Sequence, residues 1–184
     1  MARAKLAPPP EGTTAEAVAL GLSTTPLATA IDRDDHTPAI VNLLANALTW
    51  GESKVFRRLF ALGTNEWRVL SALTKYPGAT ATQLCGVITM NKSVMSRAAT
   101  ILLERRLIDQ LEGARGSRHL YLTADGVRMH DAMAPVALEL QAIVHADLTP
   151  AEVEQANALM LRMLAASARL QDYQPGAFAA AAAR

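Results

Sequence analysis

The chain has 184 residues, of which 51% are apolar and only 4% aromatic, and its formal net charge is +1. This length suits one domain with a sizeable core, and the many alanines and leucines favour helices. The single cysteine, Cys85, excludes an intramolecular disulfide and fits a reducing compartment. No apolar run reaches the roughly 18 residues that a membrane span needs, and no signal peptide is expected, so we expect a cytoplasmic protein.

Residues 1–35 are predicted to form an N-terminal arm. The prolines at positions 8–10 predict a disordered or extended stretch. Thr13 followed by Glu16 has the spacing of a capping box, which predicts a short helix across Val18 to Leu22. The arm could pack on a partner subunit, or it could be a loose tail.

A long helix is predicted next, within residues 36–63. Thr37 is a suitable N-cap, Pro38 suits the first helical position, and Gly63 is the expected stop. A helix of about 25 residues carries more apolar surface than so small a domain can cover. We therefore expect a dimerisation helix. Its apolar stripe consists of Ile40, Leu43, Leu44, Ala47, Leu48, Val55, Leu59 and Phe60.

Residues 64–122 are predicted to be a DNA-binding lobe that begins with three helices. Thr64 is the expected cap of a helix over residues 65–75, in which Trp67, Val69, Leu70 and Leu73 face inward. Thr80 and Gln83 form a capping-box pattern that starts a short helix to about Val87. Asn91 is a good N-cap for a third helix, which runs to about Arg105.

The third of these helices has two different faces. Val94, Ala98, Ile101 and Leu102 recur at helical spacing and predict a buried face. The other face carries hydrogen-bond donors, two cations and small hydroxyls, which suits contacts with phosphates and bases in a DNA groove. A merely solvated face is the alternative. The candidate DNA-binding residues are Asn91, Lys92, Ser93, Ser96, Arg97 and Thr100.

A hairpin is predicted after this helix, with strands at residues 107–111 and 118–122 and a turn bounded by Gly113 and Gly116. Short helix, turn, longer helix and hairpin together predict a winged helix-turn-helix. Arg115 at the wing tip could enter the minor groove, and Arg118 could hold the backbone; either could be only a charged hairpin residue. Residues 80–122 hold six Lys/Arg and three Asp/Glu, a net charge of +3, where DNA phosphates would need it.

Two more helices are predicted at residues 123–170, and residues 171–184 are expected to be a flexible tail. Thr123 is the expected cap of a helix to about Ala146, which Pro135 should kink. Thr149, Pro150 and Glu152 predict the start of a last helix, to about Leu170. These helices should complete a two-fold dimerisation domain. Their apolar residues are Val127, Val136, Leu140, Ile143, Val144, Leu159, Met160, Met163 and Leu164.

The central motifs resemble those of the multiple-antibiotic-resistance regulator (MarR) family. The resemblance covers about residues 37–170. The chain departs from the family at three positions: Arg106 stands where most members have glycine, and Ala114 and Gly116 replace an Asp-x-Arg pair in the wing. The residues that carry the resemblance are Ser93-Val94-Met95-Ser96-Arg97, Leu102, Leu107-Ile108, Leu122-Thr123 and Gly126.

The resemblance implies a mostly α protein with a small β-hairpin wing, in which a winged helix-turn-helix is joined to a helical dimerisation domain. It also implies a homodimeric transcription regulator, usually a repressor of a catabolic or efflux operon, that binds a pseudo-palindromic operator in double-stranded DNA and is released by a small aromatic acid. A regulator without a small-molecule ligand, or a helical protein-interaction scaffold, remains an alternative. No cofactor is expected.

A pocket for the aromatic acid would need an apolar slot with a few polar groups and an arginine. The two tryptophans and their neighbours supply such groups, although core tryptophans and a solvated arginine explain them equally well. An enzyme is disfavoured, because the four histidines are scattered and form no metal-ligand pattern. Cys85 is predicted to be a buried, inert thiol. The candidate ligand-binding residues are Asn46, Trp50, Ser53, Trp67 and Arg68.

Overall fold

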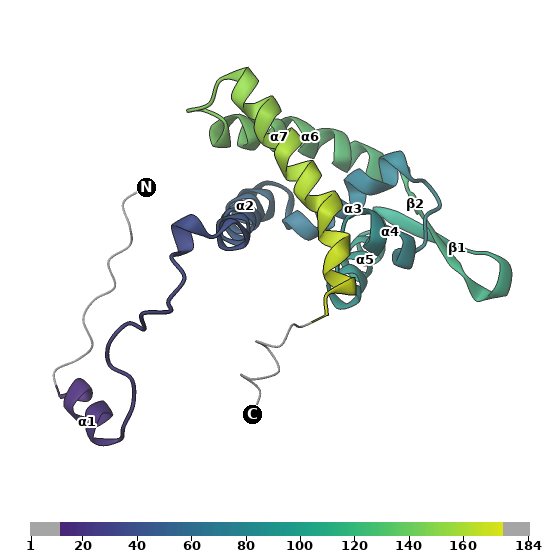
Figure 1. The fold of residues 1–184 in the computed structure, drawn as a ribbon. Helices are drawn as coiled ribbons and strands as arrows, with labels where there is room; N and C mark the ends of the chain where they lie inside the picture. The colour runs from purple at the N-terminus through teal and green to yellow at the C-terminus, as the bar shows by residue number, and fades with distance from the viewer. Residues whose placement is uncertain (1–11, 175–184) are drawn as a thin grey trace. The chain divides into compact units, whose positions relative to one another are not determined.

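The computed structural model of the protein describes residues 12–174. They fall into two compact units, and the boundary lies inside one long helix, between Thr49 and Trp50. The described elements, in chain order, are α1 (Thr13–Ala19), a 3-10 turn (Arg33–Asp35), α2 (Thr37–Phe60), α3 (Thr64–Lys75), α4 (Ala81–Val87), α5 (Lys92–Glu104), β1 (Ile108–Glu112), a 3-10 turn (Ala114–Gly116), β2 (Arg118–Leu122), α6 (Ala124–Val144), α7 (Pro150–Ser167) and a 3-10 segment (Ala168–Asp172) (Figure 1).

The first unit contains α1 and the first half of α2. The N-cap of α1 is Gly12, with a φ of +91°, and not Thr13. The predicted capping box at Thr13 is therefore wrong, since a left-handed glycine begins the helix one residue earlier. The helix ends at Ala19, short of the predicted Leu22. The prolines at positions 8–10 lie outside the described residues, and the role of the arm stays a prediction.

The second unit begins with the C-terminal half of α2, which ends at Phe60. The predicted end of this helix at Gly63 is wrong by three residues. The helix stops at Phe60 because Ala61 already takes a left-handed φ of +54°. The guanidinium of Arg105 donates to the carbonyls of Phe60 (2.9 Å) and Ala61 (3.0 Å). These bonds satisfy carbonyls that have no partner within the helix, so a long-range contact and not a glycine ends it.

Gly63 instead begins α3. It is the N-cap in place of the predicted Thr64, and its N–H donates to the carboxylate of Glu66 at 2.6 Å. Thr64 lies in the first turn of α3, where its N–H donates to Ser53 Oγ (3.1 Å) and its hydroxyl accepts from the same Oγ (2.9 Å). The loop between α2 and α3 is thus held from both sides.

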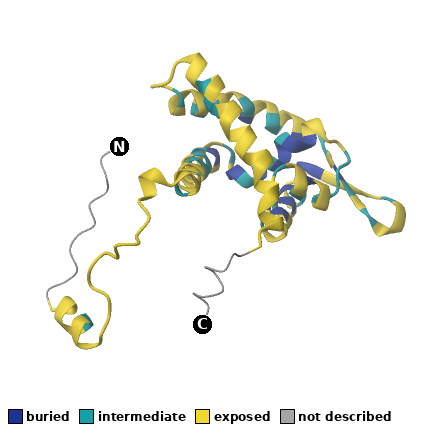
Figure 2. Ribbon diagram, in the orientation of Figure 1, coloured by how far each residue is buried: buried dark blue, intermediate teal, exposed yellow. Residues whose placement is uncertain are grey.

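The core of the second unit lies where α5 packs against α3, α4 and β1, and α6 packs against α3 and β2. Figure 2 shows the buried residues gathered around α3 and α5, whereas α7 buries none. Met95 of α5 and Met133 of α6 are fully buried although the predicted stripes omit them. Val127 and Ile143, predicted as apolar residues of the dimerisation helices, are exposed in the single chain. Unbranched methionines fill gaps that the helical period alone does not reveal.

The wing is an antiparallel hairpin whose register sets Ile108 opposite Leu122 and Glu112 opposite Arg118. Leu107, predicted to begin the first strand, precedes it and is buried. Two main-chain bonds attach the hairpin to the loop after α3: the N–H of Gly78 donates to the carbonyl of Leu120 (2.8 Å), whose own N–H donates to a loop carbonyl (3.2 Å). The wing is therefore joined to the body through its second strand.

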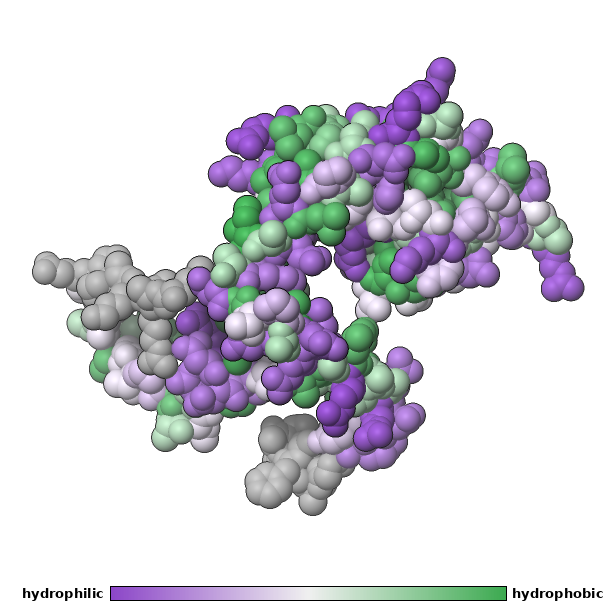
Figure 3. All heavy atoms as spheres, turned by 90° about the horizontal axis from the view of Figure 1, so that it is seen from above, coloured by the Kyte–Doolittle hydropathy of each residue, from purple (hydrophilic) through white to green (hydrophobic). Residues whose placement is uncertain are grey.

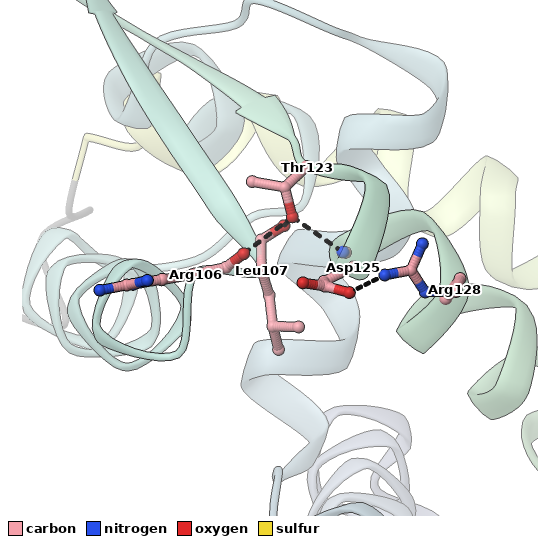
Figure 4. Close-up of polar contacts among 6 residues, drawn as sticks. Arg106, Leu107, Thr123, Asp125 and Arg128 are labelled. Carbon is pink, nitrogen blue, oxygen red and sulfur yellow. Dashed lines mark hydrogen bonds and ion pairs between the residues drawn. The ribbon is translucent and has the colours of Figure 1, made fainter.

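Thr123 joins the base of the wing to α6 (Figure 4). Its hydroxyl donates toward the carbonyls of Arg106 (2.8 Å) and Leu107 (3.2 Å) and accepts from the N–H of Gly126 (3.0 Å), as the N-cap of α6. Asp125 and Arg128 form an exposed ion pair in the same turn. A Cβ at Gly126 would lie 1.9 Å from the Leu107 carbonyl oxygen, so only glycine fits there.

Arg106 occupies a left-handed conformation, with a φ of +56°. A non-glycine residue in this region costs about 1–2 kcal/mol. We therefore expect Arg106→Gly to raise the free energy of unfolding by roughly 0.5–1 kcal/mol, since the added freedom of the unfolded glycine offsets part of the gain. Urea denaturation followed by circular dichroism measures this, and a loss of stability would contradict it. Gly86→Ala, in a helix with open space around the added methyl, tests the opposite exchange.

Helices α6 and α7 carry many exposed apolar side chains. Figure 3 shows apolar residues in green among the hydrophilic ones in purple on the surface. Their number is unusual for an isolated surface and is typical of a contact surface. None of the helices within residues 12–174 combines the length and the hydropathy that a membrane span requires. The exposed apolar residues of α6 and α7 are Val127, Leu138, Ile143, Val144, Leu159, Met160, Leu161, Met163 and Leu164.

Candidate nucleic-acid interface

The helix-turn-helix is held by two well-formed N-caps. Thr80 Oγ1 accepts from the N–H of Gln83 (3.3 Å), and the Gln83 side chain accepts from the N–H of Thr80 (2.8 Å), which confirms the predicted capping box of α4. Asn91 Oδ1 accepts from the N–H of Val94 (2.9 Å) and from the hydroxyl of Ser93 (2.8 Å). Asn91 is thus the N-cap of α5, as predicted, and it orients Ser93 at the start of the helix.

The polar face of α5 is free of the core. All six candidate residues on it are exposed, whereas Met95, Ala98, Ala99 and Leu102 are buried on the opposite side. Within the described part of the chain Arg97 forms no ion pair, so its guanidinium is available to an external anion. The recognition of DNA by α5 stays a prediction. The exposed candidates are Asn91, Lys92, Ser93, Ser96, Arg97 and Thr100.

Four of the candidates meet around one cavity. A pocket of about 340 Å³ lies between α4, α5 and the wing, and its wall includes Lys92, Ser96 and Thr100 from α5 and Arg118 from β2. Cys85 also lines it and is half-buried, so the predicted full burial of this thiol is wrong, because α4 turns it toward the pocket. The fold therefore brings α5 and the second wing strand to a single surface with two cations.

Arg115 lies apart from this pocket, at the tip of the wing. It is exposed and takes a left-handed φ of +58°, and Gly116 follows with a φ of +73°. The turn is closed by the N–H of Gly113, which donates to the carbonyl of Ser117 at 2.7 Å. Arg115 is thus the middle residue of the turn that joins the two strands.

The candidate ligand residues do not all have the same surroundings. Asn46 is exposed on the first unit. In the second unit Trp50 is 73% exposed, and Ser53 is bound to Thr64. Trp67 and Arg68 line one cavity of about 330 Å³, together with Ser71, Ala72, Lys75, Tyr76, Val87 and Ile88.

Several contacts hold Trp67 and Arg68 in place. The indole of Trp67 stacks on the ring of His130, with centroids 5.2 Å apart, and packs against Phe56. Arg68 donates a short hydrogen bond to the carbonyl of Ile88. Burial raises the pKa of Glu52, although the Thr64 hydrogen bond and the charge of Arg68 act in the opposite direction. Sequence reasoning missed Glu52 and His130, because neither lies in a motif.

Comparisons with known proteins find similarity in three-dimensional structure but none in sequence. No family model matches the chain, and no curated protein matches it in sequence. The MarR/EmrR family transcriptional regulator from Acinetobacter sp. ADP1 superposes with a TM-score of 0.70 at 23% identity, over 76% of this chain and 99% of that one. PcaV from Streptomyces coelicolor, solved with its natural ligand, gives 0.64 at 20% identity, over 76% and 99%. MepR from S. aureus, solved in a DNA complex, gives 0.62 at 16%, over 72% and 97%.

The chain has the fold of MarR-family regulators. The predicted fold class, mostly helical with a hairpin wing, is confirmed with it.

Two of the motifs that resemble the family have clear structural roles in this MarR fold. Thr123 and Gly126 clamp the start of α6 to the chain before β1, which explains the Thr-x-x-Gly spacing. Arg106, which departs from the glycine of most members, has a left-handed backbone in this chain.

The wing, which departs from the family pattern at Ala114 and Gly116, contains a histidine with two polar contacts. The ring of His119 contacts both Ser117 (3.0 Å) and the carbonyl of Gly78 (2.7 Å). Sequence reasoning counted His119 only as one of four scattered histidines. Its position on a strand directly after a turn was the available signal.

Proposed function

We propose that the protein is a homodimeric transcription regulator that binds double-stranded DNA. The observation that carries this proposal is the exposed polar face of α5, which shares one surface with Arg118 of the wing in a MarR fold. Donors and cations on such a helix suit the major groove, where Arg97 could read a base and Lys92 and Ser93 could bind phosphates. MepR, of the same fold, has been solved in a DNA complex.

In this proposal residues 64–122 form the DNA-binding lobe, and residues 36–63 and 123–170 form the dimerisation segments. The exposed apolar side chains of α6 and α7 support the second part, because a second copy of the chain would remove them from water. A two-fold dimer presents two recognition helices about one DNA turn apart, so the operator should be pseudo-palindromic. We propose repression as the mode of action, by occupation of this operator.

Selection of duplexes from a random pool tests this function, followed by footprinting on the enriched sequence. We expect a two-fold symmetric site with half-sites about 10 base pairs apart, centre to centre. Arg115 should protect the minor groove next to each half-site. If no sequence is enriched over the starting pool, the chain does not read DNA and the proposal fails.

We further propose that a small aromatic acid releases the DNA. The cavity lined by Trp67 and Arg68 supports this, since an indole and a guanidinium suit a ring and a carboxylate. PcaV, with the same fold, has a natural ligand in its structure. To act, the ligand must bind more tightly to the form that mismatches DNA.

Titration with salicylate, benzoate and their hydroxylated relatives tests the ligand. We expect quenching of tryptophan fluorescence in the wild type, and a loss of about tenfold in affinity in Arg68→Ala, which removes the charge partner of the carboxylate. Trp50→Phe serves as the control, because it leaves Trp67 as the only tryptophan reporter. No quenching by any of these acids would favour a regulator without a small-molecule ligand.

A further inference from the structure

The wing tip and the loop after α3 are connected by one side chain, that of His119. Its Nδ1 lies 2.7 Å from the carbonyl oxygen of Gly78, and its Nε2 lies 3.0 Å from Ser117 Oγ. Ser117 Oγ is also 2.9 Å from the carbonyl oxygen of Ala114, in the turn that carries Arg115. A chain of hydrogen bonds therefore runs from the body of the lobe to the tip of the wing.

The space around the ring is shaped for it. A Cβ at Gly113 would lie 2.5 Å from His119 Nε2 and 2.8 Å from Ser117 Oγ, so the ring and the hydroxyl cover the glycine directly. The main chain of His119 also forms a bridge with Thr80, the N-cap of α4. The half-buried ring is thus held between the helix-turn-helix and the turn of the wing.

The protonation of the ring decides how many of these bonds can form. A carbonyl oxygen only accepts, so Nδ1 carries a proton toward Gly78. In the neutral ring Nε2 is then an acceptor, and the single hydroxyl proton of Ser117 can serve either Nε2 or the carbonyl of Ala114, not both. In the doubly protonated ring Nε2–H donates to Ser117 Oγ, and the hydroxyl donates to Ala114. Only the charged ring allows all three hydrogen bonds, to Gly78, Ser117 and Ala114, to form together.

We propose that His119 is the residue that positions the wing for DNA, by fixing the turn around Arg115 relative to α4 and α5. This rests on the proposed DNA-binding function. A free wing samples directions in which Arg115 and Arg118 miss the DNA, and the apparent affinity falls with the fraction of molecules in the competent form. His119 need not touch DNA itself.

Matched variants separate the two ends of the chain. Asn places an amide nitrogen near the position of Nδ1, so His119→Asn keeps the bond to Gly78 and loses the one to Ser117. Ser117→Ala removes the hydroxyl and leaves the ring. We expect each to lower DNA affinity about tenfold, and the double variant no further than the worse single one, because both break the same chain. Leu111→Ala, opposite His119 in the hairpin and exposed, should bind DNA like the wild type.

A variant that restores the hydroxyl provides a readout that a merely structural role would not move. Ser117→Thr keeps a hydroxyl at this position, so it should recover most of the DNA affinity that Ser117→Ala loses. Ser117→Thr with the low affinity of Ser117→Ala would show that the hydrogen bond between this hydroxyl and His119 does not position the wing.

Amide hydrogen exchange of the DNA-free protein keeps the inference independent of DNA binding. The N–H of Gly113 bonds to the carbonyl of Ser117, and it should exchange faster in both single variants than in Leu111→Ala. Unchanged exchange at Gly113, or equal DNA affinity in the wild type and both variants, overturns the role of His119. If the wild type enriches no DNA sequence, the proposed function fails, and the exchange rates alone decide whether His119 holds the wing.

Discussion

Replacing Gly126 with alanine is expected to lower the free energy of unfolding by about 3 kcal/mol or more. The added Cβ would lie 1.9 Å from the carbonyl oxygen of Leu107 and 2.9 Å from its carbonyl carbon. Both atoms belong to main chain that Thr123 holds through its N–H (3.1 Å) and its hydroxyl (3.2 Å). Neither atom can move without opening the junction between the wing and α6. Urea denaturation measures the loss.

Gly86→Ala is the matched control for this substitution. Gly86 lies in α4, and a Cβ there meets nothing within 4 Å. Alanine should therefore stabilise the protein, by up to about 1 kcal/mol, through its higher helix propensity. Equal stability of Gly126→Ala and the wild type would show that the chain before β1 does not press on α6 as the structure describes.

Replacing Arg97 with alanine is expected to weaken sequence-specific DNA binding by about tenfold to a hundredfold, the usual effect of losing one arginine contact to a base edge. Arg97 is exposed on α5, one turn after Ser93, and within residues 12–174 no ion pair competes for it. Fluorescence anisotropy on the enriched duplex measures the change. The variant should also discriminate less between bases at one position of each half-site.

Two further variants make the Arg97 result specific. Arg33→Ala removes the same charge from the 3-10 turn before α2, outside the proposed DNA-binding lobe and dimerisation segments, and should leave DNA affinity unchanged. Lys92→Ala should weaken binding to all duplexes alike and lower the salt slope by about one, as expected for a phosphate contact. If Arg97→Ala retains the affinity and base preference of the wild type, another side chain reads the bases.

Local signals in the sequence predicted most of the helix-turn-helix. The N-caps Thr80, Asn91, Thr123 and Thr149 are all confirmed, because a side-chain oxygen that accepts from the N–H three residues later is a local arrangement. The wrong boundary at Gly63 has a non-local cause. Helix α2 ends where Arg105, 45 residues away in the sequence, donates a hydrogen bond to the carbonyl of Phe60.

The candidate site divides in the same way. The exposed face of α5 follows from helical periodicity, and its six residues are where the pattern predicted them. The meeting of Lys92 with Arg118 at one cavity, and the contact of His119 with Gly78, depend on how the hairpin folds back over α4. Sequence spacing does not contain that geometry. The link from Gly78 to His119 spans 41 residues.

The central claim, that this MarR fold reads DNA through α5 and the wing, is tested most directly by fluorescence anisotropy. A labelled duplex from upstream of the protein's own gene is compared with a scrambled duplex of equal composition, at about 50 mM and about 200 mM salt. We predict tighter binding to the upstream duplex and a fall of at least tenfold in affinity at the higher salt concentration. Equal, weak binding to both duplexes, and to a second set from neighbouring promoters, would contradict the claim.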